Sequence, residues 1–236
     1  MARIRLVAFG ALAVAACVFV STSAIDPGSA NAAANGCGST PYSYAGVETN
    51  LGTHGIAATV TVARAAVVTS GHVAGWIGVG GPGKGANGTN AWIQIGLNAE
   101  PGRDNVIYAE AWIPGRGQVY KELGEAPTGQ HVRLAILEVK GQPGTWRAWV
   151  DGRPVTDPVV LRGSERGTWQ ADALGESWRS GSQVCNSYAY RFENVRYATA
   201  AGGVWRSVAG TVSLQDPGYE VVSQAADAFV ATSVAS

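Results

Sequence analysis

The chain has 236 residues, of which 46% are hydrophobic and 14% charged, and its 17 basic side chains balance its 17 acidic ones. This composition excludes a disordered tail, a coiled coil and a strongly basic nucleic-acid-binding protein. All-β domains commonly reach roughly 200–250 residues as single units. The length is therefore sufficient for one large core, and we expect a single folded domain.

The N-terminus has the pattern of a secretory signal. Arg3 and Arg5 precede a 15-residue apolar run, and small residues then offer cleavage after Ala24 or after Ala32. A membrane-spanning helix needs roughly 18–20 apolar residues, so the run is short for an anchor. We therefore expect residues 1–32 to be a signal peptide with a short linker, and the remainder to be secreted (extracellular) without stable membrane insertion.

The cysteines divide between this signal and the rest of the chain. Cys17 lies in the apolar run at a position that resembles a lipobox, but the apolar residues directly after it argue against a lipoprotein. Removing the signal leaves Cys37 and Cys185, and an even pair in an oxidising compartment favours a disulfide. The bridge would close a loop of about 150 residues and could stabilise the fold by up to roughly 5 kcal/mol. We expect its role to be structural.

Residues 33–236 contain short runs of β-branched and aromatic residues that are separated by glycine and proline. In chain order, the clearest candidate strands are 56–68, 75–80, 91–97, 105–113, 132–139, 145–150, 188–197 and 204–214. No segment before residue 220 has a long apolar stripe of helical period, which argues against βαβ folds. The stretch 219–234 fits a helix or an edge strand, and we favour strand. The sequence therefore predicts an all-β fold, an antiparallel β-sandwich of two stacked sheets of the concanavalin-like jelly-roll type.

The alternation inside these strands separates two faces. In residues 91–97, Ile93 and Ile95 lie on one face, whereas Trp92 and Gln94 lie on the other. The neighbouring strands carry further polar and aromatic residues with the same spacing: Trp76, Tyr108, Glu110 and Trp112. An aromatic and amide face opposite an aliphatic one predicts a groove for an extended polymer, either polysaccharide or polypeptide. The alternative is that these aromatic residues form a second core layer or cover a loop.

Several motifs point to chemistries that their context excludes. The glycine-rich residues 78–84 lack the following helix that nucleotide phosphates need, because residues 85–90 cannot form one. The residues around His72 are similar to a trypsin-like histidine segment, but no matching serine motif exists. The histidines His54, His72 and His131 lack metal-ligand spacing and are better explained as surface or hydrogen-bonded residues. We expect no metal, no cofactor and no nucleic-acid partner.

One family combines the remaining features. Residues 74–81, 92–96 and 108–114 resemble, in order and spacing, the glutamic peptidases, which are also called eqolisins or peptidase family G1. A looser similarity extends from about residue 46 to the C-terminus. The segment 182–186 has no counterpart in the fungal members, so the resemblance is to a distant branch. It implies a sandwich of two antiparallel sheets with a glutamine and glutamate dyad on the concave sheet.

The resemblance also implies roles for individual residues. Gln94 matches the catalytic glutamine, and Glu176 is the candidate for the catalytic glutamate, with Glu110 and Glu193 as alternatives. The residues that we expect to bind substrate are Trp76, Trp92, Glu110, Trp112 and Trp178.

Amide hydrolysis needs an activated water, a proton for the leaving nitrogen and a stabilised oxyanion. Glu176 could act as base and then acid, while the Gln94 amide donates to the oxyanion. An ordinary glutamate pKa of about 4.3 then predicts an optimum in acid. We therefore expect a monomeric endopeptidase acting on extended polypeptides. The alternatives are a noncatalytic lectin-like or polymer-binding sandwich, or a glycosidase with two carboxylates on different strands.

Overall fold

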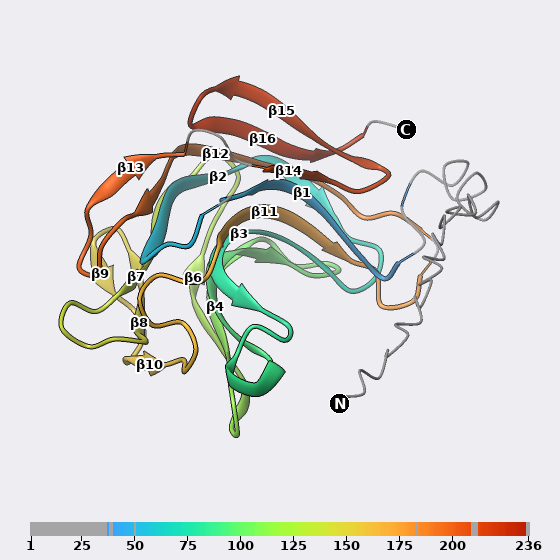
Figure 1. Cartoon of the computed structure of the whole chain (residues 1–236). Coiled ribbons are helices and arrows are strands. Elements are labelled where there is room, and N and C mark those ends of the chain that lie inside the picture. The colour runs from blue at the N-terminus through green and yellow to red at the C-terminus, as the bar shows by residue number, and fades with distance from the viewer. Residues whose placement is uncertain (1–36, 38–39, 50, 183, 209–211, 235–236) are drawn as a thin grey trace, which may run out of the picture.

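The computed structural model describes residues 37, 40–49, 51–182, 184–208 and 212–234. The expected signal peptide, residues 1–32, lies outside this part of the chain. Within it, no helix has the length and apolar character that crossing a membrane would require. The chain folds into two large β-sheets that face each other (Figure 1).

The first sheet has seven strands, and each of its neighbouring pairs is antiparallel. From edge to edge it consists of β14 (Val212–Gln215), β1 (Tyr42–Glu48), β11 (Ala171–Trp178), β3 (His72–Gly81), β4 (Ala91–Ala99), β5 (Val106–Ile113) and β6 (Gly117–Glu125). Strands distant in sequence, such as β1 and β11, therefore lie side by side.

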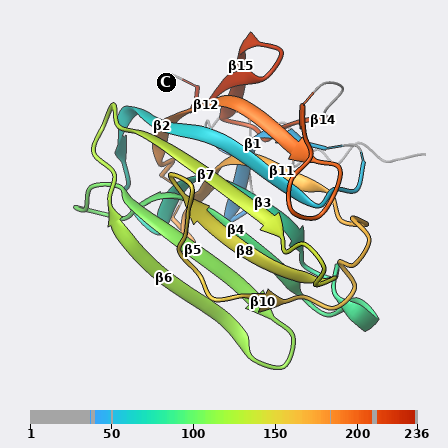
Figure 2. The same ribbon diagram turned by 90° about the vertical axis from the view of Figure 1, so that its left-hand side faces the viewer.

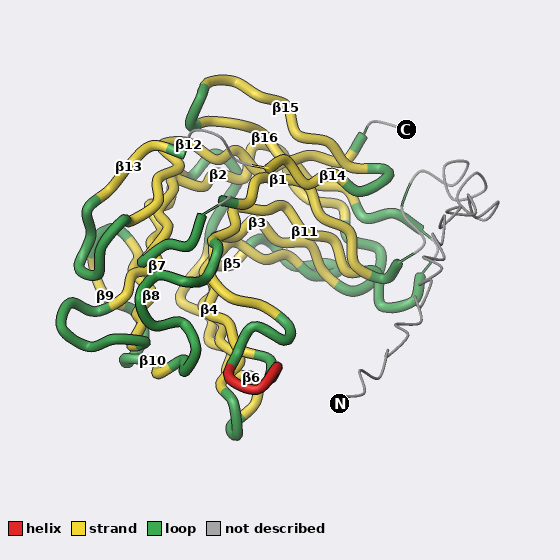
Figure 3. Tube along the Cα trace, viewed as in Figure 1, coloured by secondary structure: helices red, strands yellow, loops and turns green. Residues whose placement is uncertain are grey.

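The second sheet has nine strands and covers one face of the first (Figure 2). Its main path consists of β10 (Val159–Val160), β8 (Thr145–Val150), β7 (His131–Glu138), β2 (Gly55–Val67), β12 (Ser187–Ala198), β16 (Ala228–Ser233) and β15 (Tyr219–Ala225). Two short strands attach to it, β13 (Trp205–Ser207) to β12 and β9 (Arg153–Pro154) to β8. Among the described residues the only helical element is the short 3₁₀ turn Ala86–Gly88, red in Figure 3.

The aliphatic faces of the two sheets pack together and form the core. Ile77, Ile93 and Ile95 of the first sheet and Ile136 and Phe192 of the second are almost completely buried. Because side chains alternate along a strand, the other face of the seven-stranded sheet carries the residues between these core positions. That outer face is where the predicted site residues lie.

The predicted all-β sandwich is confirmed, and residues 219–234 form strands as expected. Five strands were not among the predicted elements: the two-residue strands β9 and β10, and the longer strands β1, β6 and β11. The three longer strands have a common feature. Each mixes polar residues and glycine with apolar ones, and their strand conformation depends on pairing with neighbours. The predicted strand 204–214 is wrong as one element: it contains β13, which pairs in the nine-stranded sheet, and β14, which pairs in the other.

The predicted disulfide is present. Cys37 and Cys185 are bonded, with their Cα atoms 5.7 Å apart. The bond ties the chain before β1 to the chain before β12, so it connects segments that enter different sheets.

Candidate active site

A groove of about 890 Å³ runs over the outer face of the seven-stranded sheet. Its walls are mainly aromatic and its ionisable residues mainly acidic. The aromatic residues that line it are Tyr42, Tyr44, Trp76, Trp92, Tyr108, Tyr120 and Trp178. The carboxylates that line it are Glu48, Glu100, Glu110, Asp172 and Glu176.

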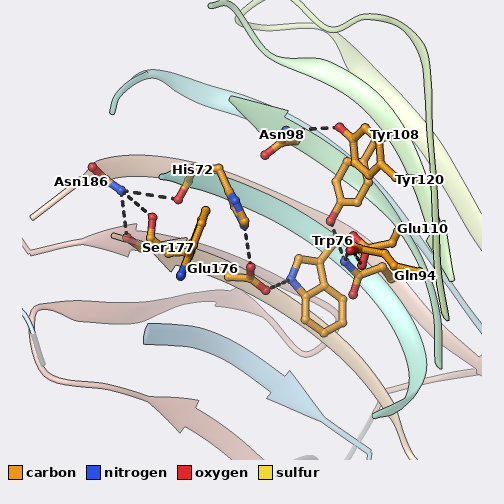
Figure 4. Close-up of polar contacts among 12 residues, drawn as sticks. His72, Trp76, Gln94, Asn98, Tyr108, Glu110, Tyr120, Glu176, Ser177 and Asn186 are labelled. Atoms are coloured by element: carbon orange, nitrogen blue, oxygen red, sulfur yellow. Dashed lines mark hydrogen bonds and ion pairs between the residues drawn. The ribbon is translucent and has the colours of Figure 1, made fainter. Parts of the chain in front are cut away.

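Gln94 projects from β4 into this groove, and its amide is held by two neighbours (Figure 4). Its Nε2 donates to the Tyr108 hydroxyl at 3.1 Å and, more weakly, to the Glu110 carboxylate at 3.4 Å. Burial raises the pKa of Tyr108 well above its ordinary value, so this hydroxyl keeps its proton. The Tyr108 oxygen accepts from Gln94, which leaves its own O–H free to donate into the groove.

Glu110 stands directly opposite Gln94 on β5. Gln118 donates to its other oxygen at 3.0 Å. Burial raises the pKa of Glu110 above its ordinary 4.5, and the charge of Glu176 acts in the same direction, whereas the hydrogen bond from Gln118 opposes both. Glu110 therefore orients the amide of Gln94 and carries a proton more readily than a solvated glutamate does.

Glu176 lies on β11 with only 7% of its surface exposed, and both of its oxygens have partners. The indole Nε1 of Trp76 donates to Oε2 at 3.0 Å, and Nε2 of His72 lies 2.9 Å from Oε1. In Figure 4 the indole of Trp76 lies between the Glu176 carboxylate and the Gln94 side chain. The two residues of the predicted dyad thus share the groove but are separated within it.

Asp172 lies four residues before Glu176 on the same strand and faces the same groove. Its side chain makes no hydrogen bond or ion pair within the described part of the chain, and its buried Oδ1 has no partner there. Burial raises the pKa of Asp172 from 3.8 to about 7; the nearby charge of Glu48 adds to this effect, and Lys84 opposes it.

Strand register determines which of these groups are neighbours. Gly78 on β3 is directly opposite Asp172 on one side and directly opposite Gln94 on the other. Glu176 is instead directly opposite Ala74, which lies four residues before Gly78 on β3. With strands about 4.8 Å apart and about 3.3 Å per residue, the Cα atom of Gln94 lies about 10 Å from that of Asp172 and about 16 Å from that of Glu176.

Aromatic pairs form both ends of the groove. At one end Trp92 and Trp112 stack with ring centroids 5.3 Å apart. At the other end Trp178 stacks on Tyr42 at 6.1 Å and lies 5.3 Å from the His72 ring. Such flat apolar surfaces suit the side chains of an extended peptide or the rings of a sugar.

The structure therefore brings most of the predicted site residues to one surface. Those that line the groove are Trp76, Trp92, Gln94, Glu110, Glu176 and Trp178. Trp112, on the neighbouring strand β5, stacks on Trp92. The alternative acid Glu193 is excluded, because it lies on β12 of the other sheet, 3.7 Å from His131.

Asp172 and His72 are among the groove residues that sequence reasoning missed. Asp172 and Glu176 are four residues apart on one strand, so their side chains lie on the same face. This spacing would have identified Asp172 as a groove residue if the strand had been predicted. His72 was interpreted only as a surface or hydrogen-bonded residue. It does have a hydrogen-bonding partner, but that partner is Glu176. Within the described ranges, no three metal-ligating side chains come together.

Comparison with solved structures finds the same fold in glutamic peptidases. A crystal structure of scytalido-glutamic peptidase with a peptide-based transition state analogue matches with a TM-score of 0.60 and 14% sequence identity, covering 81% of this chain and 98% of that one. SCP-B, a member of the eqolisin family, in a complex with the tripeptide Ala-Ile-His, matches with a TM-score of 0.53 over the same shares, also with 14% identity. No protein-family model matches the sequence, and no curated protein matches it. The chain has the glutamic peptidase fold.

Proposed function

We propose that this protein is a secreted endopeptidase that hydrolyses peptide bonds in the groove of the seven-stranded sheet. The observation that carries the proposal is the amide of Gln94, which projects into an aromatic groove, is held by Tyr108 and has ionisable carboxylates on either side. This arrangement can provide what amide hydrolysis needs: a donor for the oxyanion, and a carboxylate that activates the water and then protonates the leaving nitrogen.

The oxyanion would be stabilised by two groups that are already oriented. The Nε2 group of Gln94 would exchange its weak 3.4 Å contact with Glu110 for one with the oxyanion, and the Tyr108 hydroxyl would donate its free hydrogen. Neither group ionises in the range where carboxylates titrate, so both donors persist while the acid works.

Polypeptide is the substrate class that the groove favours. An extended strand can lie along the sheet with its side chains against the aromatic pairs at the two ends. The two solved glutamic peptidases described above hold a peptide-based analogue and a tripeptide, which supports the same substrate class for this chain.

Secretion is part of the proposal. The N-terminal pattern of two arginines, an apolar run and small residues supports export. The Cys37–Cys185 disulfide supports an oxidising destination. With Glu176 as the acid, as the sequence predicts, cleavage is expected to be fastest in acid.

Digestion of a heat-denatured protein by the purified, disulfide-bonded mature chain tests this function. We expect peptide fragments from the wild type and about 100-fold slower release from Gln94→Ala, because one oxyanion donor is lost. Gln142→Ala, at an exposed turn, is the matched control. Absence of cleavage at every pH between 3 and 9 would refute the proposal.

The stacked Trp92 and Trp112 pair supports a second candidate, a noncatalytic polymer-binding sandwich. In that case the groove would hold a glycan or peptide without cutting it. Saturable binding of a polysaccharide by the wild type, lost in Trp92→Ala and unaccompanied by hydrolysis, would identify it.

A further inference from the structure

The carboxylate of Glu176 has two partners of different character. The indole Nε1 of Trp76 donates to Oε2 at 3.0 Å, and the imidazole Nε2 of His72 lies 2.9 Å from Oε1 (Figure 4). An indole N–H only donates and stays neutral, whereas an imidazole ordinarily gains a positive charge as the pH falls from about 8 to about 5. His72 is therefore the partner whose charge changes with pH beside Glu176.

Strand register brings His72 to this carboxylate. His72 is the first residue of β3 and stands directly opposite Trp178 on β11, while Glu176 stands opposite Ala74. His72 and Glu176 are thus diagonal neighbours on the groove face, at a separation of about 7–8 Å that long side chains can span. The His72 ring also packs against the indole of Trp178, with ring centroids 5.3 Å apart. These contacts direct Nε2 at the carboxylate.

The backbone next to His72 is held by one buried side chain. The amide of Asn186 donates to the carbonyl oxygen of Ser70 at 2.9 Å and to that of Trp178 at 3.2 Å. Its oxygen accepts from the backbone N–H of Thr69 at 2.9 Å. Asn186 is completely buried. It ties the chain that enters β3 to the end of β11, so the imidazole of His72 has a fixed starting point.

Burial of Glu176 makes a charged partner useful. Only 7% of Glu176 is exposed, and removal from water disfavours the ionised form of a carboxyl. A general base must be ionised, so the site has to offset this cost when the solution is acidic. An opposite charge within about 4–6 Å moves the titration of a carboxyl towards acid by about 1–3 pH units. Because 26% of the His72 side chain is exposed, solvent screens its charge and the lower end of that range applies.

The other ionisable groups around His72 are acidic or neutral. Burial raises the pKa of Glu110 on β5, and the charge of His72 acts against this effect. Glu100 directly follows β4 and is paired with Arg103 outside the groove lining. From β1, Tyr42 presents only its ring, which stacks on Trp178. No lysine or arginine is among the described residues that line the groove, so His72 is the source of positive charge there.

We propose that His72 is the positioning residue of Glu176: its Nε2–H holds Oε1 in place, and its positive charge keeps the buried carboxylate ionised, so that cleavage extends further into acid. This inference rests on the proposed peptide-bond hydrolysis and names the residue that regulates its carboxylate. Glu176 remains the base and then the acid of the reaction, and His72 acts through it.

The test measures kcat and KM from pH 2 to 7 on an internally quenched peptide chosen from the cleavage map of a denatured protein. His72→Gln places an uncharged amide donor at a reach similar to that of Nε2, so it separates the charge from the hydrogen bond. We expect the half-maximal pH of the acid limb of kcat/KM to rise by about one unit, with a loss of about 10-fold at the acid end and less than about threefold above pH 6.

Two further variants frame this result. His72→Ala removes both the charge and the donor, so it should show the same shift and an additional loss of about 10-fold or more at every pH. His131→Gln is the matched control, because His131 also lies near a glutamate, 3.7 Å from Glu193, but on β7 of the other sheet. It should leave the acid limb unchanged.

A titration tests the same coupling without a substrate and without a variant of His72. NMR follows the imidazole signals of the three histidines in the wild type and in Glu176→Gln. Because coupling between two sites is reciprocal, loss of the carboxylate charge should move the titration midpoint of one imidazole towards acid by about one unit. A contact that only held the ring in place would leave all three midpoints unchanged.

The outcomes separate this inference from the proposed function. If the wild type cleaves the peptide and the acid limb of folded His72→Gln lies within about 0.3 unit of that of the wild type, the role of His72 is overturned and the peptidase function stands. Three imidazole midpoints that Glu176→Gln leaves unchanged also overturn the role of His72. A wild type that cleaves nothing overturns both proposals.

Discussion

Replacing Asp172 by asparagine should stabilise the folded protein in a pH-dependent way. The pKa of this carboxyl is about 7 in the folded state and 3.8 without the surroundings that raise it. The folded chain therefore holds the proton more tightly than the unfolded chain, and folding stability falls as pH rises from about 4 to about 7. Below about pH 4, Asp172 is protonated in both the folded and the unfolded chain, and its burial costs the wild type no ionisation energy. Above about pH 7, Asp172 is ionised in both states, and the full cost of burying its charge lowers the stability of the wild type.

The size of the effect follows from the same two pKa values. Each unit of difference between the folded and unfolded pKa corresponds to 1.36 kcal/mol, so the upper limit of the stabilisation by Asp172→Asn is about 4 kcal/mol. Asp172 is partly exposed to the groove, so solvent screening reduces our expectation to about 2 kcal/mol. For a domain of this size that corresponds to a rise in Tm of about 4–8 °C for Asp172→Asn above pH 7.

Thermal unfolding of the disulfide-bonded wild type and variant at pH 4, 6 and 8 measures this difference. We expect the Tm difference to grow with pH and to level off near pH 8, because asparagine is neutral throughout. Asp104→Asn, at an exposed loop position, controls for the removal of a carboxyl as such. A Tm difference between Asp172→Asn and the wild type that is the same at pH 4 and pH 8 would show that burial does not hold a proton on Asp172.

Three further predictions concern the Gln94 amide, the buried carboxylate of Glu138 and the disulfide. Gln94→Glu should lower kcat/KM about 100-fold or more above pH 6, because the added negative charge would repel the oxyanion. The rate is measured on an internally quenched peptide. A rate within threefold of the wild type would contradict the oxyanion role of Gln94. Glu138→Ala should cost about 3 kcal/mol in urea unfolding, because Glu138 is 1% exposed, is hydrogen-bonded to His54 and accepts from the backbone N–H of Gly144. A loss below 1 kcal/mol would show that these contacts contribute little to stability. Cys37→Ser combined with Cys185→Ser should lower the free energy of unfolding by about 2–5 kcal/mol. At temperatures where the variant is folded, kcat should be unchanged. A changed kcat would show that the disulfide affects the geometry of the groove.

The sequence by itself determined the faces of the sheets. Alternation in the strand of Ile93, Gln94 and Ile95 assigned the isoleucines to the core and the glutamine to the groove, because side chains on a strand can point to only two sides. It also identified Cys37 and Cys185 as a pair, because removal of the signal leaves no other cysteines.

Only the tertiary structure decided how Asp172 and Glu176 lie relative to the Gln94 amide. Asp172 and Glu176 are four residues apart on β11, so the two-residue period of a strand places both on the groove face. The period cannot show which of the two lies closer to Gln94. Their distances from Gln94 depend on how β11 and β4 align on β3. The alignment of β11 on β3 is set by pairing between residues about 100 positions apart in the chain. Register places Gly78 between Gln94 and Asp172 and leaves Glu176 beside Trp76, a non-local result that no short stretch of sequence encodes.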